Sequence, residues 1–566
     1  MSELPPPAPL LKLSLELPSS VLGTERELPL QMCESAIRSR VNALMETLGI
    51  PGSAAVSITV DTATPAADRA LRLSVNGEPC RYSDELLHWT ASYVLGAPAV
   101  AGASVASVWR WIAAAARARA DRSGRPVIDF VTETSVEILK CNRRLLLGDD
   151  QVEAYAAGLE PPLRLAAARD VWPPSPSWLG PVLRDVLELR AGIGDRRAVA
   201  TVLADAENIS HPRAVVEELV AAIGPSAFEI QLAADVADRL TAGETASVRE
   251  TFAFIRDGMF VETGMSYPEF HLVIADDLKP GTFAFAIGPI RTPPLRALGP
   301  DEHLVNDTRN RLKKDKIKSR RASNPATAQP AAIVSTSQRD VMGKGLDGRT
   351  TWDFRGHLIL SMAAVLRQQG YCFVNRNFTR DRLDLIGRVF PAIGTHLAAK
   401  GYTDVHVTGV FRALVAEEIS IRNTRRILDL LIQCPFSQSD DRLLLEWVRK
   451  GMSRALREKY ARGTDVLVVY LLEPRIEAMI SRPKRQPTEA EWDAILSAVR
   501  TETAFLPLTA QRPAVLTTAL ARPALRKALE SEFPRIPVIC FEELPPSTTV
   551  QPVARIALAA AATGAG

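Results

Sequence analysis

Few residues in this sequence have the type and spacing that chemistry requires. Asp276 and Asp277 are adjacent and could bind a cation, but neighbouring side chains on an extended chain point to opposite sides, and no ladder of further acidic residues follows. Gly343, Gly345 and Gly348 have the spacing of a dinucleotide-binding loop, but no strand precedes them and no packed helix is expected after them. We therefore interpret the acidic pair as a solvated turn and the glycines as part of a linker.

The other chemistry-bearing residue types are equally dispersed. The six cysteines form no CxxC pair, and the seven histidines form no HxxxH or HExxH motif. The sequence contains no GxxxxGK[ST] phosphate loop and no GxSxG nucleophile elbow. We therefore expect no catalytic, cofactor-binding or metal-binding residues, and a protein that is not an enzyme.

Length and composition favour a soluble protein of several domains. A chain of 566 residues suggests roughly two to four domains. The net charge of +3 is small for this size, so binding of nucleic acid through the whole body is not indicated. No signal peptide is evident, and the uncharged stretch 89–108 is too rich in Ala, Gly and Ser to favour membrane insertion. We expect a cytoplasmic protein without a membrane span.

The pattern of apolar residues predicts an α+β multidomain fold. Residues 10–80 read as strand–helix–strand–strand, and residues 228–287 repeat that order. The predicted segments are an α/β unit (1–80), an Ala/Gly-rich connector and helix (81–125), a helical subdomain (126–224), a second α/β unit (225–300), a basic low-complexity linker (301–350), a second helical subdomain (351–455) and a C-terminal α/β domain (456–566).

The predicted linker contains the most basic stretch of the chain. Residues 309–321 read RNRLKKDKIKSRR, and residues 322–348 are rich in Ala, Ser, Thr and Gly without periodicity. We interpret the whole as a mobile tether. Because no aromatic residue lies in the run, base stacking is not offered and nucleic acid is an unfavoured partner. Peripheral contact with an anionic membrane is left open.

Two stretches of the chain match each other without a gap. Residues 182–203 align with residues 410–431, so that Ile193 is aligned with Ile421 and Leu203 with Leu431. Since an α/β unit precedes each helical segment, we interpret the chain as two tandem copies, of which only the second ends in a C-terminal α/β domain. Chance similarity between two amphipathic helix pairs is the alternative.

The second of these stretches contains a distinctive word. Ser420 is followed by Ile-Arg-Asn-Thr-Arg-Arg-Ile-Leu, which predicts an amphipathic helix over 421–432 with Ser420 as its N-cap. Arg422, Arg425 and Arg426 lie largely off the apolar stripe. The word resembles Ser-Ile-Arg-Asp-Leu-Arg-x-Ile-Leu of the FHIPEP family, the export-gate proteins of flagellar and virulence type III secretion.

Further words follow in the order of that family. Residues 256–264, which include Asp257, Phe260 and Glu262, resemble its Asp-Gly-Leu-Phe-x-Glu-Leu-Gly, and residues 268–281 resemble its next strand, acidic pair and Pro-Gly turn. Residues 469–474 (VYLLEP) resemble Val-Tyr-Leu-Leu-Asp-Pro, and residues 522–526 resemble Arg-Pro-x-Leu-Arg. The resemblance covers roughly 330 residues, in the order that the family prescribes.

The resemblance implies a binding and scaffold protein of protein secretion, which assembles into rings and recognises chaperones, substrates or components of the apparatus. It implies candidate signature or partner-binding residues, for which a packing role is the alternative: Asp257, Phe260, Glu262, Asp276, Asp277, Ser420, Arg422, Arg425 and Arg426. Two departures stand out, because the family carries transmembrane helices before this part and a small α/β subdomain where this sequence has the basic stretch. A cytoplasmic adaptor recruited away from secretion is the other function considered.

Overall fold

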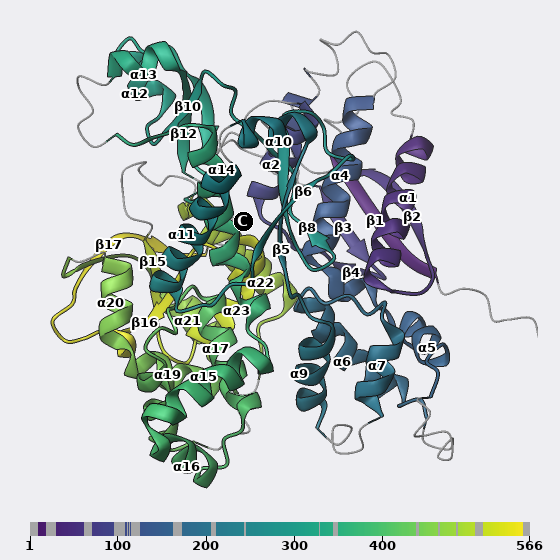
Figure 1. Ribbon diagram of the computed structural model, residues 1–566, viewed down its shortest axis with the longest axis vertical. Helices are drawn as coiled ribbons and strands as arrows, with labels where there is room; N and C mark the ends of the chain where they lie inside the picture. The colour runs from purple at the N-terminus through teal and green to yellow at the C-terminus, as the bar shows by residue number, and fades with distance from the viewer. Residues whose placement is uncertain are drawn as a thin grey trace, which may run out of the picture. The chain divides into compact units, whose positions relative to one another are not determined.

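The computed structural model describes residues 10–18, 30–61, 71–95, 108–109, 111–112, 114, 125–161, 172–204, 211–242, 245–327, 329–342, 349–436, 441–461, 464–482, 485–503 and 513–558. The chain forms two compact units (Figure 1). The first unit consists of residues 1–260 and 266–378, and the second consists of residues 261–265 and 379–566. The predicted glycine motif at 343–348 lies outside the described residues.

The first sheet of unit 1 confirms the predicted strand–helix–strand–strand order. Its strands lie in the order β2-β1-β3-β4, with β1 parallel to β2 and antiparallel to β3. The leucines at alternate positions of β1 are all buried, because one face of the sheet packs against α1. The elements are β1 (Leu10–Pro18), α1 (Leu30–Leu48), β2 (Ser53–Asp61), β3 (Arg72–Val75) and β4 (Glu78–Pro79).

The second sheet of unit 1 has the same plan. Its main path is β6-β5-β7-β8, with β5 parallel to β6 and antiparallel to β7, while β9 also pairs with β7. The sequence did not predict the short helix α10, which follows β5 directly. The elements are β5 (Phe228–Leu232), α10 (Ala234–Thr241), α11 (Thr245–Thr263), β6 (Phe270–Ile274), β7 (Thr282–Ile287), β8 (Ile290–Arg291) and β9 (Leu295–Arg296).

The prediction of a mobile tether at 301–350 is wrong, because this segment folds into a small α/β subdomain. Its four strands lie in the order β11-β12-β10-β13. The elements are β10 (Glu302–Val305), α12 (Arg309–Lys314), β11 (Arg320–Ser323), β12 (Pro330–Ser335), α13 (Thr336–Met342) and β13 (Thr351–Trp352). The subdomain therefore stands where the sequence analysis expected the family's inserted subdomain to be missing.

A small core explains why this basic segment folds. Val305, Leu312, Ile317, Ala332 and Val334 bury their side chains together. Leu312 and Ile317 lie inside the basic run at a spacing that places them on the inner side, so the surrounding cations cover the core without entering it. The sequence analysis interpreted charge and small residues as disorder, although five apolar residues pack strands β10 and β12 against helix α12 and the segment that follows it.

Helices account for the rest of unit 1. They are α2 (Asp84–Leu95), α4 (Arg125–Cys141), α5 (Asp149–Ala157), α6 (Pro176–Glu188), α7 (Arg196–Leu203), α9 (Pro212–Ile223) and α14 (Phe354–Gln369). The predicted connector at 81–125 thus begins as helix α2, and most of its remainder lies outside the described residues. Within the described part of the chain, no helix is both long and apolar enough to cross a membrane.

Two helices that the sequence predicted in unit 2 are each divided in the structure. The helix expected over 379–397 is broken at Phe390, because Pro391 starts a new helix, and that expected over 439–462 is broken at Met452. The helices are α15 (Arg376–Val389), α16 (Pro391–Ala399), α17 (Asp404–Ala416), α18 (Thr424–Ile432), α19 (Asp441–Gly451) and α20 (Ser453–Ala461).

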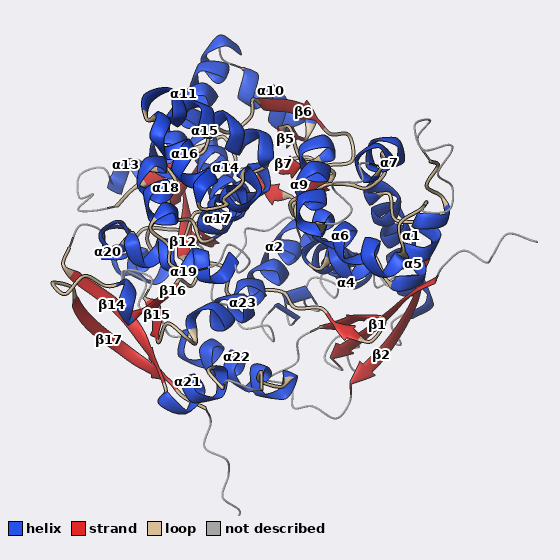
Figure 2. Cartoon of the chain, turned by 90° about the horizontal axis from the view of Figure 1, so that it is seen from below, coloured by secondary structure: helices blue, strands red, loops and turns tan. Residues whose placement is uncertain are grey.

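The C-terminal part of unit 2 is an α/β layer, as predicted. Its sheet is parallel throughout, in the order β16-β15-β14-β17 (Figure 2). Helices between the strands cover it, as parallel connections require. The elements are β14 (Val466–Leu472), α21 (Pro474–Ile480), α22 (Glu489–Thr503), β15 (Ala514–Thr517), α23 (Arg522–Glu532), β16 (Val538–Cys540) and β17 (Thr549–Ile556).

One half-buried histidine, with a buried ring nitrogen, makes the stability of unit 1 depend on pH. His357 of α14 packs edge-on against the Phe283 ring, and its Nδ1 is buried without a hydrogen-bond partner. Burial, and then the charge of Arg296, lower the pKa of His357 from 6.5 to about 4. Between those values the unfolded chain binds the proton more readily, so stability is complete above pH 6.5 and falls as the pH is lowered.

We expect the free energy of unfolding of unit 1 to fall by about 1–2 kcal/mol between pH 6.5 and pH 5. Urea unfolding at a series of pH values measures this loss. His357→Phe should flatten the slope, because no proton can then be taken up on unfolding. His396→Gln, which replaces an exposed histidine of α16, is the control and should leave the slope unchanged. A slope in His357→Phe as steep as that of the wild type would contradict the assignment.

Candidate functional site

The turn between α17 and α18 carries the most distinctive word of the sequence. After α17 ends at Ala416, the backbone of Glu418 takes a left-handed conformation with φ of 56°. The Glu418 amide donates to the Val415 carbonyl at 2.8 Å, and the Ile419 amide donates to the Leu414 carbonyl at 2.8 Å. These bonds satisfy carbonyls that the end of a helix leaves without intrahelical partners. A left-handed backbone conformation is uncommon for a residue other than glycine, so Glu418 distinguishes this turn from an ordinary helix end.

Asn423, and not Ser420, caps helix α18. The Asn423 side chain accepts a hydrogen bond from the Arg426 amide at 3.2 Å, whereas the Ser420 hydroxyl accepts one from the Arg422 amide at 3.3 Å. The predicted N-cap at Ser420 is therefore wrong, and the helix begins at Thr424. The reason is tertiary, because the Ile421 amide is used by another segment and the chain from 420 to 422 cannot yet turn into a helix.

That other segment is the C-terminus of α11. The Ile421 amide donates to the Thr263 carbonyl at 2.9 Å, and Ile421 is fully buried. Gly264 follows with φ of 74°, and a Cβ atom there would lie 2.2 Å from the Arg422 nitrogen. Only glycine fits such a contact. Arg382 of α15 donates to the Gly264 carbonyl from the other side. The two densest family words, 256–264 and 417–426, therefore meet at this backbone contact.

The three predicted arginines surround the contact but do not converge on a common point. Arg422 donates to the Val261 carbonyl at 3.4 Å. Arg425 lies over the Phe390 ring, at 4.0 Å from the ring centre. Arg426 donates to the Gly451 carbonyl at 3.3 Å. Arg422, in the turn before α18, and Arg425 and Arg426, in α18, therefore each contact a neighbouring segment of unit 2, which is the packing role that the sequence analysis held as an alternative.

The predicted acidic and aromatic residues lie elsewhere. Asp257 and Phe260 are exposed on α11 in unit 1, and Glu262 is exposed in unit 2. Asp276 and Asp277 occupy an exposed turn after β6, as predicted. Asp277 accepts two hydrogen bonds from Arg291, at 2.9 and 2.7 Å, and these bonds lower its pKa. The structure does not gather these five residues into one site, and their role in partner binding stays a prediction.

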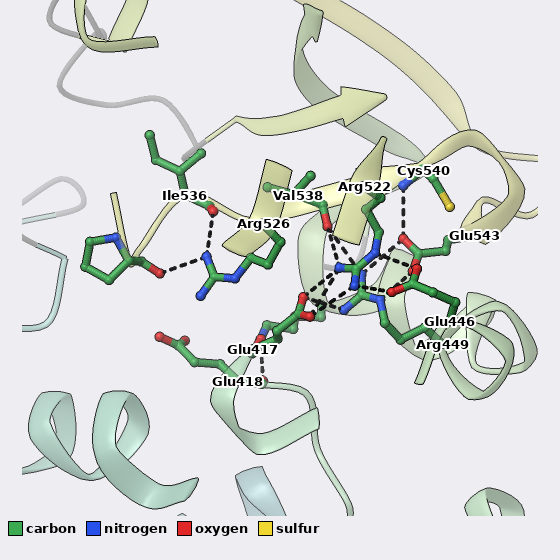
Figure 3. Close-up of polar contacts among 12 residues, drawn as sticks. Glu417, Glu418, Glu446, Arg449, Arg522, Arg526, Ile536, Val538, Cys540 and Glu543 are labelled. Atoms are coloured by element: carbon green, nitrogen blue, oxygen red, sulfur yellow. Dashed lines mark hydrogen bonds and ion pairs between the residues drawn. The ribbon is translucent and has the colours of Figure 1, made fainter. Parts of the chain in front are cut away.

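A buried ion-pair network begins at Glu417, beside the turn (Figure 3). Arg449 of α19 is fully buried, and it donates to Glu417 at 2.8 Å and to Glu543 at 2.5 Å. Arg522 at the start of α23 is 1% exposed and binds Glu417 at 2.9 Å. Arg522 also pairs with Glu446 of α19, with its Nε 2.6 Å from that carboxylate. Two arginines and three glutamates thus satisfy one another inside unit 2.

The charges of this network shift the pKa values of its members in different directions. Burial alone would raise the pKa of Glu417, but the charges of Arg449 and Arg522 outweigh it and hold that pKa below its usual value. For Glu446 burial prevails, and its pKa is raised. Burial lowers the pKa of Lys459, which donates to the backbone carbonyls of Glu417 and Glu418, to about 8.

The network joins the helical subdomain to the C-terminal α/β layer. Glu417 and Arg449 come from the helical side, whereas Arg522 and Glu543 come from the α/β side. Every carboxylate in it is bound to an arginine. Sequence reasoning missed the network, because Glu417 is separated by 105 residues from Arg522. The only signal was that Glu417 and Arg522 fall at the edges of two family words.

A second backbone contact in unit 1 has the geometry of the first. Between α6 and α7, Arg190 has φ of 59°, and the Asp195 side chain caps α7 by accepting from the Ala198 amide at 2.9 Å. The Ile193 amide donates to the Leu48 carbonyl of α1 at 2.8 Å. Gly49 follows with φ of 78°, and a Cβ atom there would lie 2.3 Å from the Gly194 Cα.

Small α/β units and helical subdomains, with one such backbone contact in each unit and a buried ion-pair network beside the last α/β layer, define a multidomain α+β fold. The chain belongs to the FHIPEP family, whose sequence model matches residues 203–549. The resemblance stated from the sequence is thereby confirmed. No group of three or more His, Cys, Asp or Glu side chains that could hold a metal ion occurs among the residues that the structure describes.

The chain is similar to curated proteins, one of which is named for secretion. It is 24% identical over 332 residues to the Low calcium response locus protein D of Yersinia pestis, covering 56% of this chain and 45% of that protein. It is 24% identical over 343 residues to the Hypersensitivity response secretion protein HrcV of Ralstonia nicotianae, covering 58% of this chain and 48% of that protein. The chain thus spans about half the length of the curated relatives it matches.

A solved structure is also similar to more than half of this chain. The CdsV protein of Chlamydia pneumoniae is 25% identical, with a TM-score of 0.53, and the match covers 59% of this chain and 98% of that one. The mixed α+β architecture predicted from the sequence is therefore found in a relative. Nearly all of the solved CdsV chain has a counterpart here, which agrees with the presence of the inserted subdomain at 301–352.

Proposed function

We propose that this chain works in type III protein secretion, in the cytoplasm, as an export-gate-like scaffold that binds chaperones, substrates or components of the apparatus. The observation that carries the proposal is the match to CdsV over 98% of that chain, together with secretion relatives over more than half of this one. The inserted subdomain supports it further. The sequence analysis expected this subdomain to be missing, and it is folded here.

We further propose that binding, and not catalysis, is the activity. The most concentrated group of ionisable side chains in the described residues is the network around Arg449, where each glutamate is bound to an arginine. Such an arrangement favours a rigid subdomain boundary over proton transfer. An assay of the purified chain against a broad panel of hydrolase substrates should find no turnover that exceeds that of an Arg449→Met variant.

The tandem-copy interpretation is also a proposal, and three similarities support it. The two sheets of unit 1 have the same strand order and pairing. The left-handed residues Arg190 and Glu418 lie at aligned positions of the two matching stretches. Gly49 and Gly264 each end a helix at a close contact with the backbone just after Ile193 and Ile421. Three coincidences of geometry at aligned positions favour duplication over chance similarity.

Self-association belongs to the same proposal. Leu385 and Val389 lie one helical turn apart on α15, and their exposed fractions are 58% and 65%. Together they form a small exposed apolar patch. We expect mass measurement of the purified chain to give a defined oligomer at micromolar concentration. The double variant Leu385→Glu with Val389→Glu should be monomeric, whereas Leu520→Glu, at another exposed leucine of unit 2, should not change the mass. A wild-type chain that is strictly monomeric would contradict self-association.

The adaptor function has one observation in its favour. Arg309, Lys313, Lys314, Lys316 and Lys318 are exposed around α12 and the following turn and form no ion pair in the described structure. Binding experiments at increasing salt separate the two functions. Salt-tolerant binding to chaperone–substrate complexes from the organism that produces this chain would support the secretion scaffold. Binding to heparin alone that is lost steeply as salt increases would favour the adaptor.

A further inference from the structure

The strand β6 is an open edge of the second sheet. Its only neighbour in the described structure is β5, so the opposite side of its backbone has no partner strand. Its last three residues are apolar and exposed: Leu272 by 38%, Val273 by 36% and Ile274 by 60%. An uncovered apolar edge is a template for another strand.

The register shows which backbone groups are available. The Ala275 amide donates to the Leu232 carbonyl at 2.9 Å, so residue 275 directs its backbone groups toward β5. Because these directions alternate along a strand, Phe270, Leu272 and Ile274 direct their amides and carbonyls outward. Three outward donors and three outward acceptors are thus presented, and an extended chain could pair with them along the whole of β6.

The other long edges of the described sheets are protected. The edge strand β17 contains Pro552 and Arg555, which weaken pairing with a further strand. The strand β2, which has the place of β6 in the first sheet, buries its apolar residues Val56 and Ile58 to 8% exposure. Residues 270–274 contain no proline and no charged residue. The exposure of β6 is therefore a property of this edge and not of the fold plan.

Charges at both ends of β6 select its partner. Glu269 precedes the strand and Asp276 follows it, and both are exposed. A second copy of this chain, paired antiparallel about Leu272, would bring Glu269 of one chain close to Asp276 of the other. That repulsion disfavours self-pairing. A segment with apolar residues in its middle and Lys or Arg at its ends would instead place opposite charges together.

We propose that β6 docks an extended segment of another protein by strand addition, and that this segment is apolar at alternate positions and basic at both ends. Backbone hydrogen bonds to Phe270, Leu272 and Ile274 hold the segment, and the exposed apolar side chains of β6 contact its own. Glu269 and Asp276 fix its ends. The proposal goes beyond the secretion role, because it holds whether or not the partner belongs to a secretion system.

Binding of two synthetic peptides to the full chain tests the proposal. The fluorescein-labelled peptide KTVTVTVK is the probe, and ETVTVTVE, with acidic ends, is its twin. By fluorescence anisotropy at physiological salt, we expect the basic-ended peptide to bind at least tenfold more tightly than the twin. Hydrogen exchange within 268–276 should slow when the basic-ended peptide is added. Equal affinity for the two peptides, or no binding of either at millimolar concentration, would overturn the proposal.

Two variants locate the binding. Leu272→Pro removes an outward amide and leaves the pairing with β5 in place, and we expect it to weaken the probe at least tenfold. Ile274→Lys leaves the backbone intact and adds a repelling charge, so it should weaken the probe even if the proline variant unfolds. Val553→Lys, at an exposed position of β17, is the matched control and should bind as the wild type does. Unchanged binding by Ile274→Lys, or a dimer that this variant dissociates, would contradict the assignment.

Discussion

Replacing Arg449 with methionine is expected to destabilise unit 2 by about 3–5 kcal/mol, because it leaves the buried carboxylate of Glu543 without a counter-charge, whereas Glu417 keeps Arg522. Arg449 is fully buried and is the cation that binds Glu543, which is itself 1% exposed. Methionine has a similar length and fills the space, so the loss reports the charge and hydrogen bonds and not a cavity. The loss in the free energy of unfolding is measured by urea unfolding that is monitored through hydrogen exchange in α19 and β16.

A matched variant separates buried from exposed pairing. Arg425 pairs with Asp429 at 3.7 Å, lies over the Phe390 ring and is 55% exposed, so Arg425→Met should cost no more than about 1 kcal/mol. Adding Glu543→Gln to Arg449→Met should recover part of the loss, because an unpaired buried carboxylate becomes a neutral amide. A loss in Arg449→Met no greater than that in Arg425→Met would refute the view that this network holds the two layers of unit 2 together.

Local pattern was sufficient for the parts of the fold whose core face is written in consecutive residues. The alternating leucines of β1 and the apolar run of β14 predicted strands because the period of two needs no knowledge of distant contacts. The same analysis of local pattern failed for the segment 301–350. Two of its core residues, Leu312 and Ile317, stand singly within the basic run, and only the folded subdomain brings them together with Val305, Ala332 and Val334.

The candidate site could be located but not described from the sequence. The family words drew attention to 417–426 and 256–264, and the structure joins them through Thr263 and Ile421. The cap moved from Ser420 to Asn423 because a distant carbonyl holds the Ile421 amide, a constraint that no local rule contains. The ion-pair network escaped for the same reason, since its members are spread over more than a hundred residues.

Replacing Gly264 with alanine is expected to destabilise the α17–α18 turn by about 2–4 kcal/mol. The left-handed backbone of Gly264 disfavours any side chain, and the added Cβ would lie 2.2 Å from the Arg422 nitrogen, which is backbone and cannot rotate away. The Thr263–Ile421 hydrogen bond must therefore lengthen as the two segments separate. Hydrogen exchange at Ile421 and through α18 should become faster, and the logarithm of the rate should rise in proportion to the lost free energy.

Variants at other glycines separate the cost of the left-handed backbone from the cost of the clash made by the added Cβ. They also test the tandem-copy proposal. Gly77 has φ of 87° with nothing within 4 Å of the added Cβ, so Gly77→Ala should show the conformational cost alone, about 1 kcal/mol. Gly258 lies inside α11 in open space, and Gly258→Ala should be neutral or stabilising. If the two halves are copies, Gly49→Ala should cost unit 1 about as much as Gly264→Ala costs unit 2, because each Cβ meets the same aligned backbone at nearly the same distance. A cost for Gly49→Ala as small as that for Gly77→Ala would mean that the backbone near Ile193 moves away from the added Cβ at little cost. The two turns would then share a geometry but not an energetic role, which would contradict the expectation from duplication.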